Sequence, residues 1–456
     1  MAKECRVKFL PDEKTVMVKK GTDLRTAAVL AGIDLRSGCG GEGTCGRCAV
    51  IVREGTVTRG EGNLSRRLKR MGCVLACRAW VEGDAVVEVL PESRMGLGAY
   101  TVESLASPED ESAADRYALD PIARCVSVRL DEPSLESNAP DATRLMKSLK
   151  REGPTDKTSL DMEALRRLPE TLRAAGWDVD VVWGDYGDRT AVFDVLPSGR
   201  SKILGVAIDI GTTTVTVDLV DLKTGGFIGR RSDYNRQARY GDDVISRIIH
   251  ADEGGSREKS GLEDLREAVL ETINDLVISL VTSSGFDPED IKAAQVSGNT
   301  TMSHLFLGIP PRYIRLEPYI PAANEFPTGF AGELGLAIHP RAPVHTVPAV
   351  ASYVGGDIVS GVLAVGMDRS DDLSLFIDIG TNGEMVLGNS DWMVGCACSA
   401  GPCFEGSGMT CGTRAIPGAV WKVMVRGEEF SASRRDPGDV LVRTIGGAPP
   451  IGICGS

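Results

Sequence analysis

Histidine and aromatic residues are scarce in this chain of 456 residues. It contains only four His, none at metal-ligand or catalytic-triad spacing, and Phe, Trp and Tyr together make up 5%. This scarcity leaves no case for hydrolysis by an activated nucleophile. No run of about 18 apolar residues occurs, which argues against a membrane-spanning helix. The P-loop signature G-x-x-x-x-G-K followed by Ser or Thr is also absent.

Positive charge is in deficit as well. The 51 Lys and Arg face 64 Asp and Glu, so the net charge is −13. Without a basic run, this balance argues against sequence-independent binding of nucleic acid, although it leaves room for a local basic docking face. The first residues, MAKECRVKFL, lack the apolar core of a signal peptide. We therefore expect a cytoplasmic protein with neither membrane nor nucleic-acid partners.

The pattern of residues 1–92 is typical of a β-grasp fold. The expected elements are strands at 5–10 and 14–19, a helix from 24, a strand at 48–52, a short basic helix near 64–70 and a last strand near 85–89. Polar residues 93–122 then predict a linker. Residues 123–199 predict a small α/β middle domain, with strands at 125–130, 178–183 and 190–195 and helices near 140–151 and 159–174.

Twelve cysteines occur, and four of them predict a metal centre in the β-grasp unit. Cys39, Cys45 and Cys48 are spaced C-x5-C-x2-C within a glycine-rich loop, and Cys77 follows after 28 residues. Four thiolates satisfy a [2Fe–2S] cluster, and the interleaved glycines let backbone N–H groups face its sulfurs. The alternatives are a zinc site, which usually takes two short Cys pairs, and Cys73 in place of Cys77 as the fourth ligand.

From residue 203 the pattern changes to that of a buried sheet. ILGVAIDIG at 203–211 is nearly all apolar, so we expect a strand buried on both faces. A second strand follows at 214–221, with a hairpin turn at 224–226 and a long amphipathic helix at 259–283. Asp-Ile-Gly-Thr ends the strand at 209–212 and recurs at 378–381 after another apolar strand. The recurrence predicts an internal repeat of one strand–turn–strand unit.

Both repeated turns offer phosphate-binding chemistry. Glycine lets the backbone approach a phosphate, Thr and Asn donate hydrogen bonds to it, and a strand-end Asp can hold hydrated Mg²⁺ or orient water. The candidate residues are Asp209, Gly211, Thr212, Thr213 and Thr214 in the first copy, and Asp378, Gly380, Thr381 and Asn382 in the second. Two such hairpins would clamp the phosphates of one ATP. The alternative is a duplicated structural hairpin.

With both sets of motifs, the chain resembles the reductive activators of corrinoid proteins. The resemblance rests on the cysteine loop, DIGTTT (209–214), NRQARYGDDVISRI (235–248), VSGNTTM (296–302), YVGGDIVSG (353–361), DIGTNGE (378–384), AGPCFEG (400–406) and GICGS (452–456). It implies a multidomain α+β and α/β chain. A β-grasp ferredoxin and a middle domain would precede an actin-like (ribonuclease H-like) ATPase domain. This domain would have subdomain I at 203–370 and an incomplete subdomain II at 371–456.

The resemblance also implies a function and its partners. The chain would transfer one electron from its [2Fe–2S] cluster to Co(II) of a corrinoid protein, giving Co(I), with ATP and Mg²⁺ as further cofactors. A low-potential donor would reload the cluster, and a homodimer is compatible with this scheme. A redox sensor whose cluster state controls the nucleotide-binding domain is the alternative. An activator of another reductase and a small-molecule kinase fit the motifs less well.

Residue roles follow from the same resemblance. Asp209 and Asp378 would flank Mg-ATP, Asn299 and Thr300 would reach the cleft, and Asp357 would orient water. The alternative for Asn299 is a helix N-cap, and for Asp357 it is stabilisation of a helix dipole. The chain ends at GICGS, before the family's glycine-rich adenosine loop. We therefore expect weak nucleotide binding and exposed apolar surface in 371–456.

Four further cysteines and two tryptophans are interpreted as structural. Cys396, Cys398, Cys403 and Cys411 form C-x-C-x4-C-x7-C, for which buried small residues are favoured over a second metal site. Trp392 and Trp421 are expected in the core.

Overall fold

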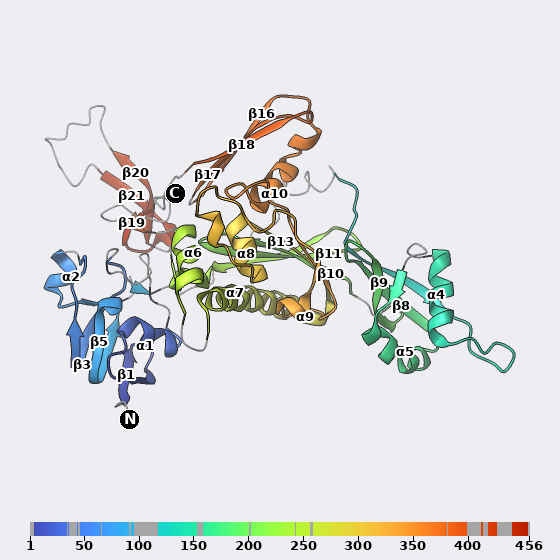
Figure 1. Ribbon diagram of the computed structural model, residues 1–456, viewed down its shortest axis with the longest axis horizontal. Helices are drawn as coiled ribbons and strands as arrows, with labels where there is room; N and C mark the ends of the chain where they lie inside the picture. The colour runs from blue at the N-terminus through green and yellow to red at the C-terminus, as the bar shows by residue number, and fades with distance from the viewer. Residues whose placement is uncertain are drawn as a thin grey trace. The chain divides into compact units, whose positions relative to one another are not determined.

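The computed structural model falls into two compact units, residues 1–360 and 361–456. Figure 1 labels their helices and strands. The structure describes residues 4–33, 35, 43, 46–64, 66–90, 93–94, 117–152, 158–199, 202–241, 243–255, 259–380, 382–398, 412–413, 418–425 and 440–454.

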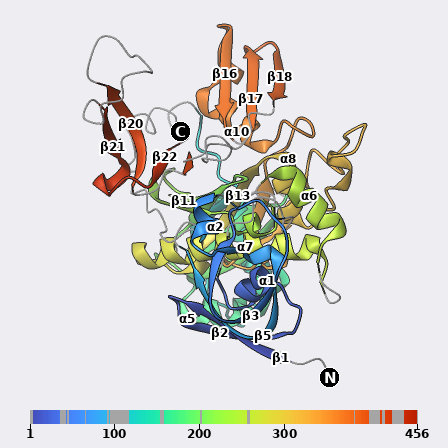
Figure 2. The same ribbon diagram turned by 90° about the vertical axis from the view of Figure 1, so that its left-hand side faces the viewer.

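The first sheet lies within residues 4–89 and has the strand order β2-β1-β5-β3-β4. Its elements are β1 (Glu4–Leu10), β2 (Lys14–Lys19), α1 (Leu24–Leu30), β3 (Ala49–Arg59), α2 (Arg66–Arg70), β4 (Val74–Leu75), η1 (Ala76–Arg78) and β5 (Ala79–Val89). The helix α1 begins at Asp23, whose side chain accepts from Thr26 N, and buries Leu24, Ala27 and Ala28 against the sheet. Figure 2 shows α1 beside these strands. The predicted order of elements is confirmed.

A four-stranded sheet, β6-β8-β9-β7, forms the next part. Its elements are β6 (Ala123–Arg129), α4 (Asp141–Glu152), β7 (Thr158–Leu160), α5 (Met162–Ala174), β8 (Asp178–Asp185) and β9 (Thr190–Pro197). The predicted helix at 159–174 starts too early. Residues 158–160 instead pair with β9 in parallel, and the Asp161 side chain caps α5 by accepting from Glu163 N.

The central sheet has six strands in the order β12-β11-β10-β13-β15-β14. Its strands are β10 (Leu204–Ile210), β11 (Thr214–Asp221), β12 (Phe227–Tyr234), β13 (Ile291–Gly298), β14 (Gly329–Phe330) and β15 (Pro343–Thr346). The accompanying helices are α6 (Val244–Glu253), α7 (Gly261–Ser284), α8 (Thr300–Leu307), α9 (Ala331–Leu334) and α10 (Gly356–Val365). Figure 1 shows the long α7 running along the sheet, and its apolar side chains join one core cluster with those of β10, β11 and β13.

The opposite face of this sheet is polar, which corrects one prediction. Val206, Ile208 and Ile210 are buried in the core, but the alternate residues Ala207 and Asp209 are exposed. The strand β10 is therefore buried on one face only at its carboxyl end. Asp209 lies in register with Thr216 on one side and with Ser297 on the other. Because residues in register share a face, a polar row crosses the sheet at this level.

A buried ionic cluster joins β9 to the central sheet. Lys292 Nζ on β13 lies 2.6 Å from Asp194 Oδ2 on β9, and His339 Nε2 lies 3.6 Å from the same oxygen. All three side chains are buried. Burial, followed by the positive charge of Lys292, lowers the pKa of His339 to about 4, so the imidazole is neutral at pH 7.

The second unit contains two small sheets. The first has the order β16-β17-β18, with β16 (Ser374–Ile379), β17 (Gly383–Gly388) and β18 (Met393–Cys398). The second has the order β19-β22-β20-β21, with β19 (Gly412–Thr413), β20 (Ala419–Val425), β21 (Val440–Thr444) and β22 (Gly452–Cys454). Leu375, Ile377 and Ile379 alternate along β16 and are at least half exposed. The predicted exposure of apolar side chains in 371–456 is confirmed for the described residues.

Two structural predictions for this unit are wrong. Trp392 and Trp421 are about half exposed rather than in the core. Cys396 and Cys398 lie on β18 and are exposed, so the interpretation as buried small residues fails for them. Cys403 and Cys411 lie outside the described residues.

Within the described ranges, no helix is both long and apolar enough to span a membrane.

Candidate cluster site and phosphate hairpins

Two of the four predicted cluster ligands meet inside the first sheet. Cys48 precedes β3 and Cys77 lies in η1, yet their Sγ atoms are 3.3 Å apart and both residues are buried. The backbone fixes this approach, because Ala76 N donates to Cys48 O at 2.8 Å. A disulfide would need about 2.05 Å between the sulfurs. Two thiolates about 2.3 Å from one tetrahedral metal ion lie roughly 3.8 Å apart, so this pair fits ligands of a shared metal.

The other two predicted ligands, Cys39 and Cys45, lie outside the described residues. Between Cys39 and Cys48, the described residues are Gly43, Gly46 and Arg47, and Gly43 contacts Arg78. Gly43 has φ +79°, and a Cβ there would lie 2.7 Å from Arg78 Cγ. Arg78, which directly follows Cys77, therefore packs against this loop where only glycine fits. Among the described residues, no group of three His, Cys, Asp or Glu side chains is arranged to hold a metal ion.

The first phosphate hairpin joins β10 to β11 through a tight turn. Gly211 N donates to Thr214 O at 2.9 Å, and a Cβ on Gly211 would lie only 2.6 Å from that oxygen. Thr212 is buried, Thr213 is half-buried and Thr214 is exposed. The turn thus requires glycine at 211, and the three threonine side chains that follow differ in how exposed they are to solvent.

Two buried polar side chains hold this hairpin from behind, and the sequence analysis missed both. Asn235 Nδ2 donates to Gly211 O at 2.9 Å, and Asn235 N donates to Thr213 O at 2.9 Å. Arg247 is fully buried on α6 and donates from Nη2 to Thr212 O at 2.5 Å. Both residues belong to the segment NRQARYGDDVISRI, which carried the family resemblance without an assigned role. These donors fix three consecutive carbonyls of the turn.

Asn299 and Thr300 behave differently at the start of α8. Asn299 Oδ1 accepts from Met302 N, so the residue is the predicted alternative, an N-cap. Its Nδ2 also donates to Thr212 Oγ1 at 3.2 Å, which brings it to the hairpin. Thr300 is fully buried and its hydroxyl donates to Ala351 O at 2.6 Å. A packing role accounts for Thr300 without a ligand.

Asp209 lies on the polar row of the central sheet. Thr216 and Ser232 continue this row across β11 and β12, with their hydroxyl oxygens 2.9 Å apart. On the other side, Ser297 Oγ lies 3.1 Å from Ser360 Oγ on α10. Asp357 is in the first turn of α10, three residues before Ser360, so the two side chains share one helix face. The structure therefore brings Asp357 to the edge of the row that contains Asp209.

The second hairpin, β16–β17, also turns at a glycine, but its backbone hydrogen bond closes over one residue fewer than in the first. Gly380 N donates to Asn382 O at 2.9 Å, and Asp378 again stands two residues before the glycine. Asp378 lies directly opposite Glu384 in the antiparallel pair, and burial raises the pKa of the Asp378 carboxyl. Among the described atoms, a Cβ on Gly380 would meet only Asn382 O, at 3.6 Å. Thr381 lies outside the described residues.

Known protein families match nearly every part of the chain. Residues 7–82 match a 2Fe-2S iron-sulfur cluster binding domain, 112–202 the RACo linker region, 204–370 the RACo middle region, and 372–456 the C-terminal domain of RACo, the ASKHA domain. ASKHA denotes the group of acetate and sugar kinases, heat-shock chaperones and actin. The matches define the class as a ferredoxin domain joined in one chain to an ASKHA domain. This confirms the predicted multidomain α+β fold class.

Individual relatives identify the family within this class. The chain is 29% identical over 456 residues to the corrinoid activation enzyme RamQ of Eubacterium limosum, covering 99% of this chain and 69% of that protein. A solved reductive activator for corrinoid, iron–sulfur protein is 44% identical, with a TM-score of 0.65 and coverage of 99% and 71%. A reductase of a Co(II) methylated amine-specific corrinoid protein from Methanosarcina barkeri is 24% identical, covering 55% and 48%. The chain belongs to the family of reductive activators of corrinoid proteins.

Proposed function

We propose that this chain restores an oxidised corrinoid protein to its active state by one-electron reduction. A [2Fe–2S] cluster supplies the electron, which converts Co(II) to Co(I). ATP bound with Mg²⁺ at the two Asp-x-Gly hairpins would drive the exchange by changing the complex between the chain and the corrinoid protein. The observation that carries the proposal is the buried Cys48–Cys77 pair, which lies in the same chain as these hairpins.

Cys39, Cys45, Cys48 and Cys77 would hold the cluster. The 3.3 Å separation of Cys48 Sγ and Cys77 Sγ supports the second pair, because both thiols face one point while buried among apolar side chains. Arg78, which packs on Gly43 of the same loop, would keep a cation near the ligands. A nearby cation favours the reduced, more negative state of the site.

The nucleotide would be held by the turn residues of both hairpins. Gly211, Thr212, Thr213 and Thr214 would contact phosphate in the first half, as would Gly380, Thr381 and Asn382 in the second. Asn299 would add its side-chain amide next to Thr212, which its 3.2 Å hydrogen bond supports. The carboxylates of Asp209 and Asp378 would bind hydrated Mg²⁺, and Asp357 would orient water from α10.

One experiment separates this function from a redox sensor. The chain is reconstituted with iron and sulfide, reduced, and mixed with a corrinoid iron–sulfur protein in its Co(II) state, with and without Mg-ATP. Growth of the Co(I) absorbance band that depends on both the cluster and ATP is the expected result. ATP hydrolysis that depends on the redox state of the cluster, with no Co(I) band, would instead identify a sensor.

A further inference from the structure

The excess of positive over negative charge in the ferredoxin domain lies in one segment. Residues 1–90 contain 16 Lys and Arg against 11 Asp and Glu, although the whole chain has a net charge of −13. Six of these 16 cations, but only one of the 11 carboxylates, lie in residues 59–78. The remaining positions hold ten of each sign. The excess positive charge of the domain therefore comes entirely from this segment.

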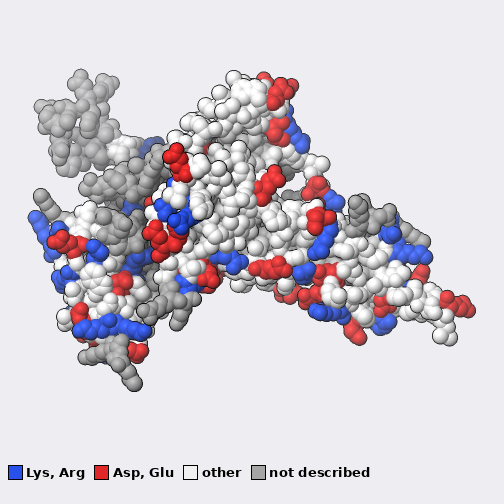
Figure 3. All heavy atoms as spheres, in the orientation of Figure 1, with Lys and Arg blue, Asp and Glu red and all other residues white. Residues whose placement is uncertain are grey.

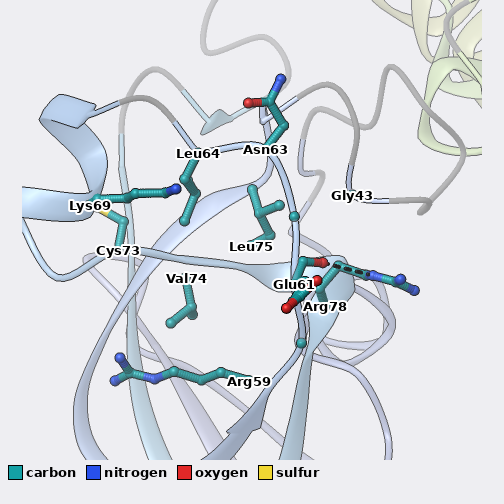
Figure 4. Close-up of a pocket in the computed structure, with 12 residues that line it drawn as sticks. Gly43, Arg59, Glu61, Asn63, Leu64, Lys69, Cys73, Val74, Leu75 and Arg78 are labelled. Atoms are coloured by element: carbon teal, nitrogen blue, oxygen red, sulfur yellow. Dashed lines mark hydrogen bonds between the residues drawn. The ribbon is translucent and has the colours of Figure 1, made fainter.

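The same segment lines a pocket of about 830 Å³ beside the cysteine loop. Figure 4 shows Arg59, Lys69 and Arg78 on different sides of the pocket, with Val74 and Leu75 between them. Gly43 of the cysteine loop and the buried thiol of Cys73 also belong to the lining. The pocket thus has an apolar floor, a cationic rim and one wall shared with the loop that would hold the cluster.

Several cations elsewhere on the domain are neutralised by a carboxylate, unlike those of the rim. Arg6, Lys20 and Arg53 are paired with Asp84, Glu82 and Glu88 respectively. Arg59, Lys69 and the adjacent Arg70 are exposed, and none of them pairs with a carboxylate of the described residues. Figure 3 shows Lys and Arg side chains over the region of α2. Glu61 is the only carboxylate among the described lining residues, and its backbone oxygen accepts from Arg78 Nε at 3.3 Å.

We propose that this cationic face, defined by Arg59, Lys69, Arg70 and Arg78, docks an acidic protein that delivers electrons to the cluster. The inference rests on the proposed function and adds the chemical class of its electron donor. One electron leaves the reduced centre of the donor and enters the oxidised [2Fe–2S] cluster, so the donor is oxidised, the cluster is reduced and no proton moves. Charge steering suits such a transient encounter, because it speeds association without a large interface.

The location favours the donor over the corrinoid protein as the occupant. In the proposed function ATP changes the complex with the corrinoid protein, so we expect the main contacts of that protein on the nucleotide-binding part of the chain. The cationic face lies on a domain that carries neither phosphate hairpin. Arg78 directly follows Cys77, so a donor seated on this face approaches a proposed ligand directly. Opposite charges on the two surfaces would also disfavour basic proteins as partners.

The test compares two charge reversals of equal size in the full chain. Lys69→Glu with Arg70→Glu alters the face, whereas Arg6→Glu with Lys19→Glu makes the same change in net charge on β1 and β2. The probe is a strongly acidic bacterial ferredoxin with [4Fe–4S] clusters. Calorimetry with the oxidised probe measures docking without electron transfer, and stopped-flow absorbance with the reduced probe measures the rate of cluster reduction.

We expect the face variant to weaken binding and slow reduction by about tenfold or more, and the control variant to change both by less than about threefold. Raising the salt concentration should slow reduction of the wild type. Reduction by methyl viologen radical, a small cation, should not be slowed by the face variant, because an added negative charge attracts a cation. Equal effects of the two variants, no effect of either, or faster reduction at high salt would overturn the proposal. The last result would indicate that acidic residues of the chain itself cover the face.

Failure here is distinguishable from failure of the proposed function. If the chain is reduced chemically and then produces Co(I) with ATP, the function stands even when the acidic ferredoxin neither binds nor reduces it. That pattern would reject the donor site alone. Docking and reduction by the ferredoxin without any Co(I) would reject the function and retain the site.

Discussion

The side chain of Asn299 hydrogen-bonds in two directions, to the first turn of α8 through Oδ1 and to Thr212 Oγ1 through Nδ2. A single residue therefore couples the start of a helix to the first phosphate hairpin. The two bonds use different atoms, so substitutions can remove one while keeping the other. This separation allows the capping and ligand-binding roles to be measured independently.

Asn299→Asp should impair nucleotide binding more than stability. The carboxylate retains the acceptor for Met302 N but loses the donor to Thr212, and it places a negative charge near the proposed phosphate site. Asn299→Ala removes the cap as well, which costs about 1 kcal/mol. We expect thermal unfolding to show a clear loss for Ala and a small one for Asp, while titration with Mg-ATP shows weaker binding for both. An Asp variant with wild-type affinity would assign Asn299 to capping alone.

Alanine should be tolerated in one hairpin and not in the other. Gly211→Ala places a Cβ at 2.6 Å from Thr214 O, a contact that forces the backbone to move, so we expect a loss of about 1–3 kcal/mol. At Gly380 the nearest atom among the described residues is at 3.6 Å, an ordinary contact, and Gly380→Ala should change stability little. Urea unfolding of the two variants provides the comparison. Equal losses would mean that the two turns are equally tight.

Replacing Cys77 should abolish the cluster, whereas replacing Cys73 should not. Cys77 Sγ lies 3.3 Å from Cys48 Sγ, but Cys73 lines the pocket beneath the cationic rim. We expect Cys73→Ser to show the visible absorbance and electron paramagnetic resonance of a [2Fe–2S] centre after anaerobic reconstitution. Cys77→Ser should lose or strongly alter both. A normal spectrum from Cys77→Ser would refute this choice of ligand.

Acid should lower the free energy of unfolding of the chain through protonation of His339. The imidazole has a pKa of about 4 in the fold and about 6.5 when unfolded, so the unfolded state binds more protons between these values. Stability is therefore fully present above pH 6.5 and falls by up to about 1.4 kcal/mol per pH unit towards pH 4.

His339→Gln keeps a polar side chain but does not titrate. We expect the variant to lose less stability than the wild type between pH 7 and pH 5 in thermal unfolding, whatever its stability at pH 7. Parallel losses in the two proteins would place the acid sensitivity at other residues.

Local sequence patterns predicted most helices and strands, because strand alternation and helix caps depend on residues that are close together in the sequence. The hairpin β10–β11 and the long α7 follow from such signals, as does the repeat at β16–β17. The error at residues 158–160 has a tertiary cause: three residues pair with the distant β9, and this pairing overrides the helical pattern that continues through them. The sequence of β10 is nearly all apolar and so did not reveal its exposed face. Ala207 occurs equally well in buried and exposed positions, and Asp209 lies at the strand end.

The sequence predicted those site residues that belong to a short motif with characteristic spacing. It did not predict residues whose role depends on contacts with residues far away in the sequence. The glycine-rich turns identified Gly211 and Thr212, and Asn299 was singled out after its apolar strand. Arg247 was missed because a buried arginine has no sequence signature. Two of its partners, Thr212 O and Gly241 O, are backbone atoms that any residue could supply. The exposure of Trp392 was missed because composition says nothing about which sheet faces are covered.

The pairing of Lys292 with Asp194 has a mechanical consequence. Pulling β9 away from β13 would leave one charge without its counter-ion in an apolar setting, a loss of several kcal/mol. This cost favours keeping the two sheets packed against each other. A rearrangement that leaves the ion pair intact is therefore less costly than one that separates β9 from β13.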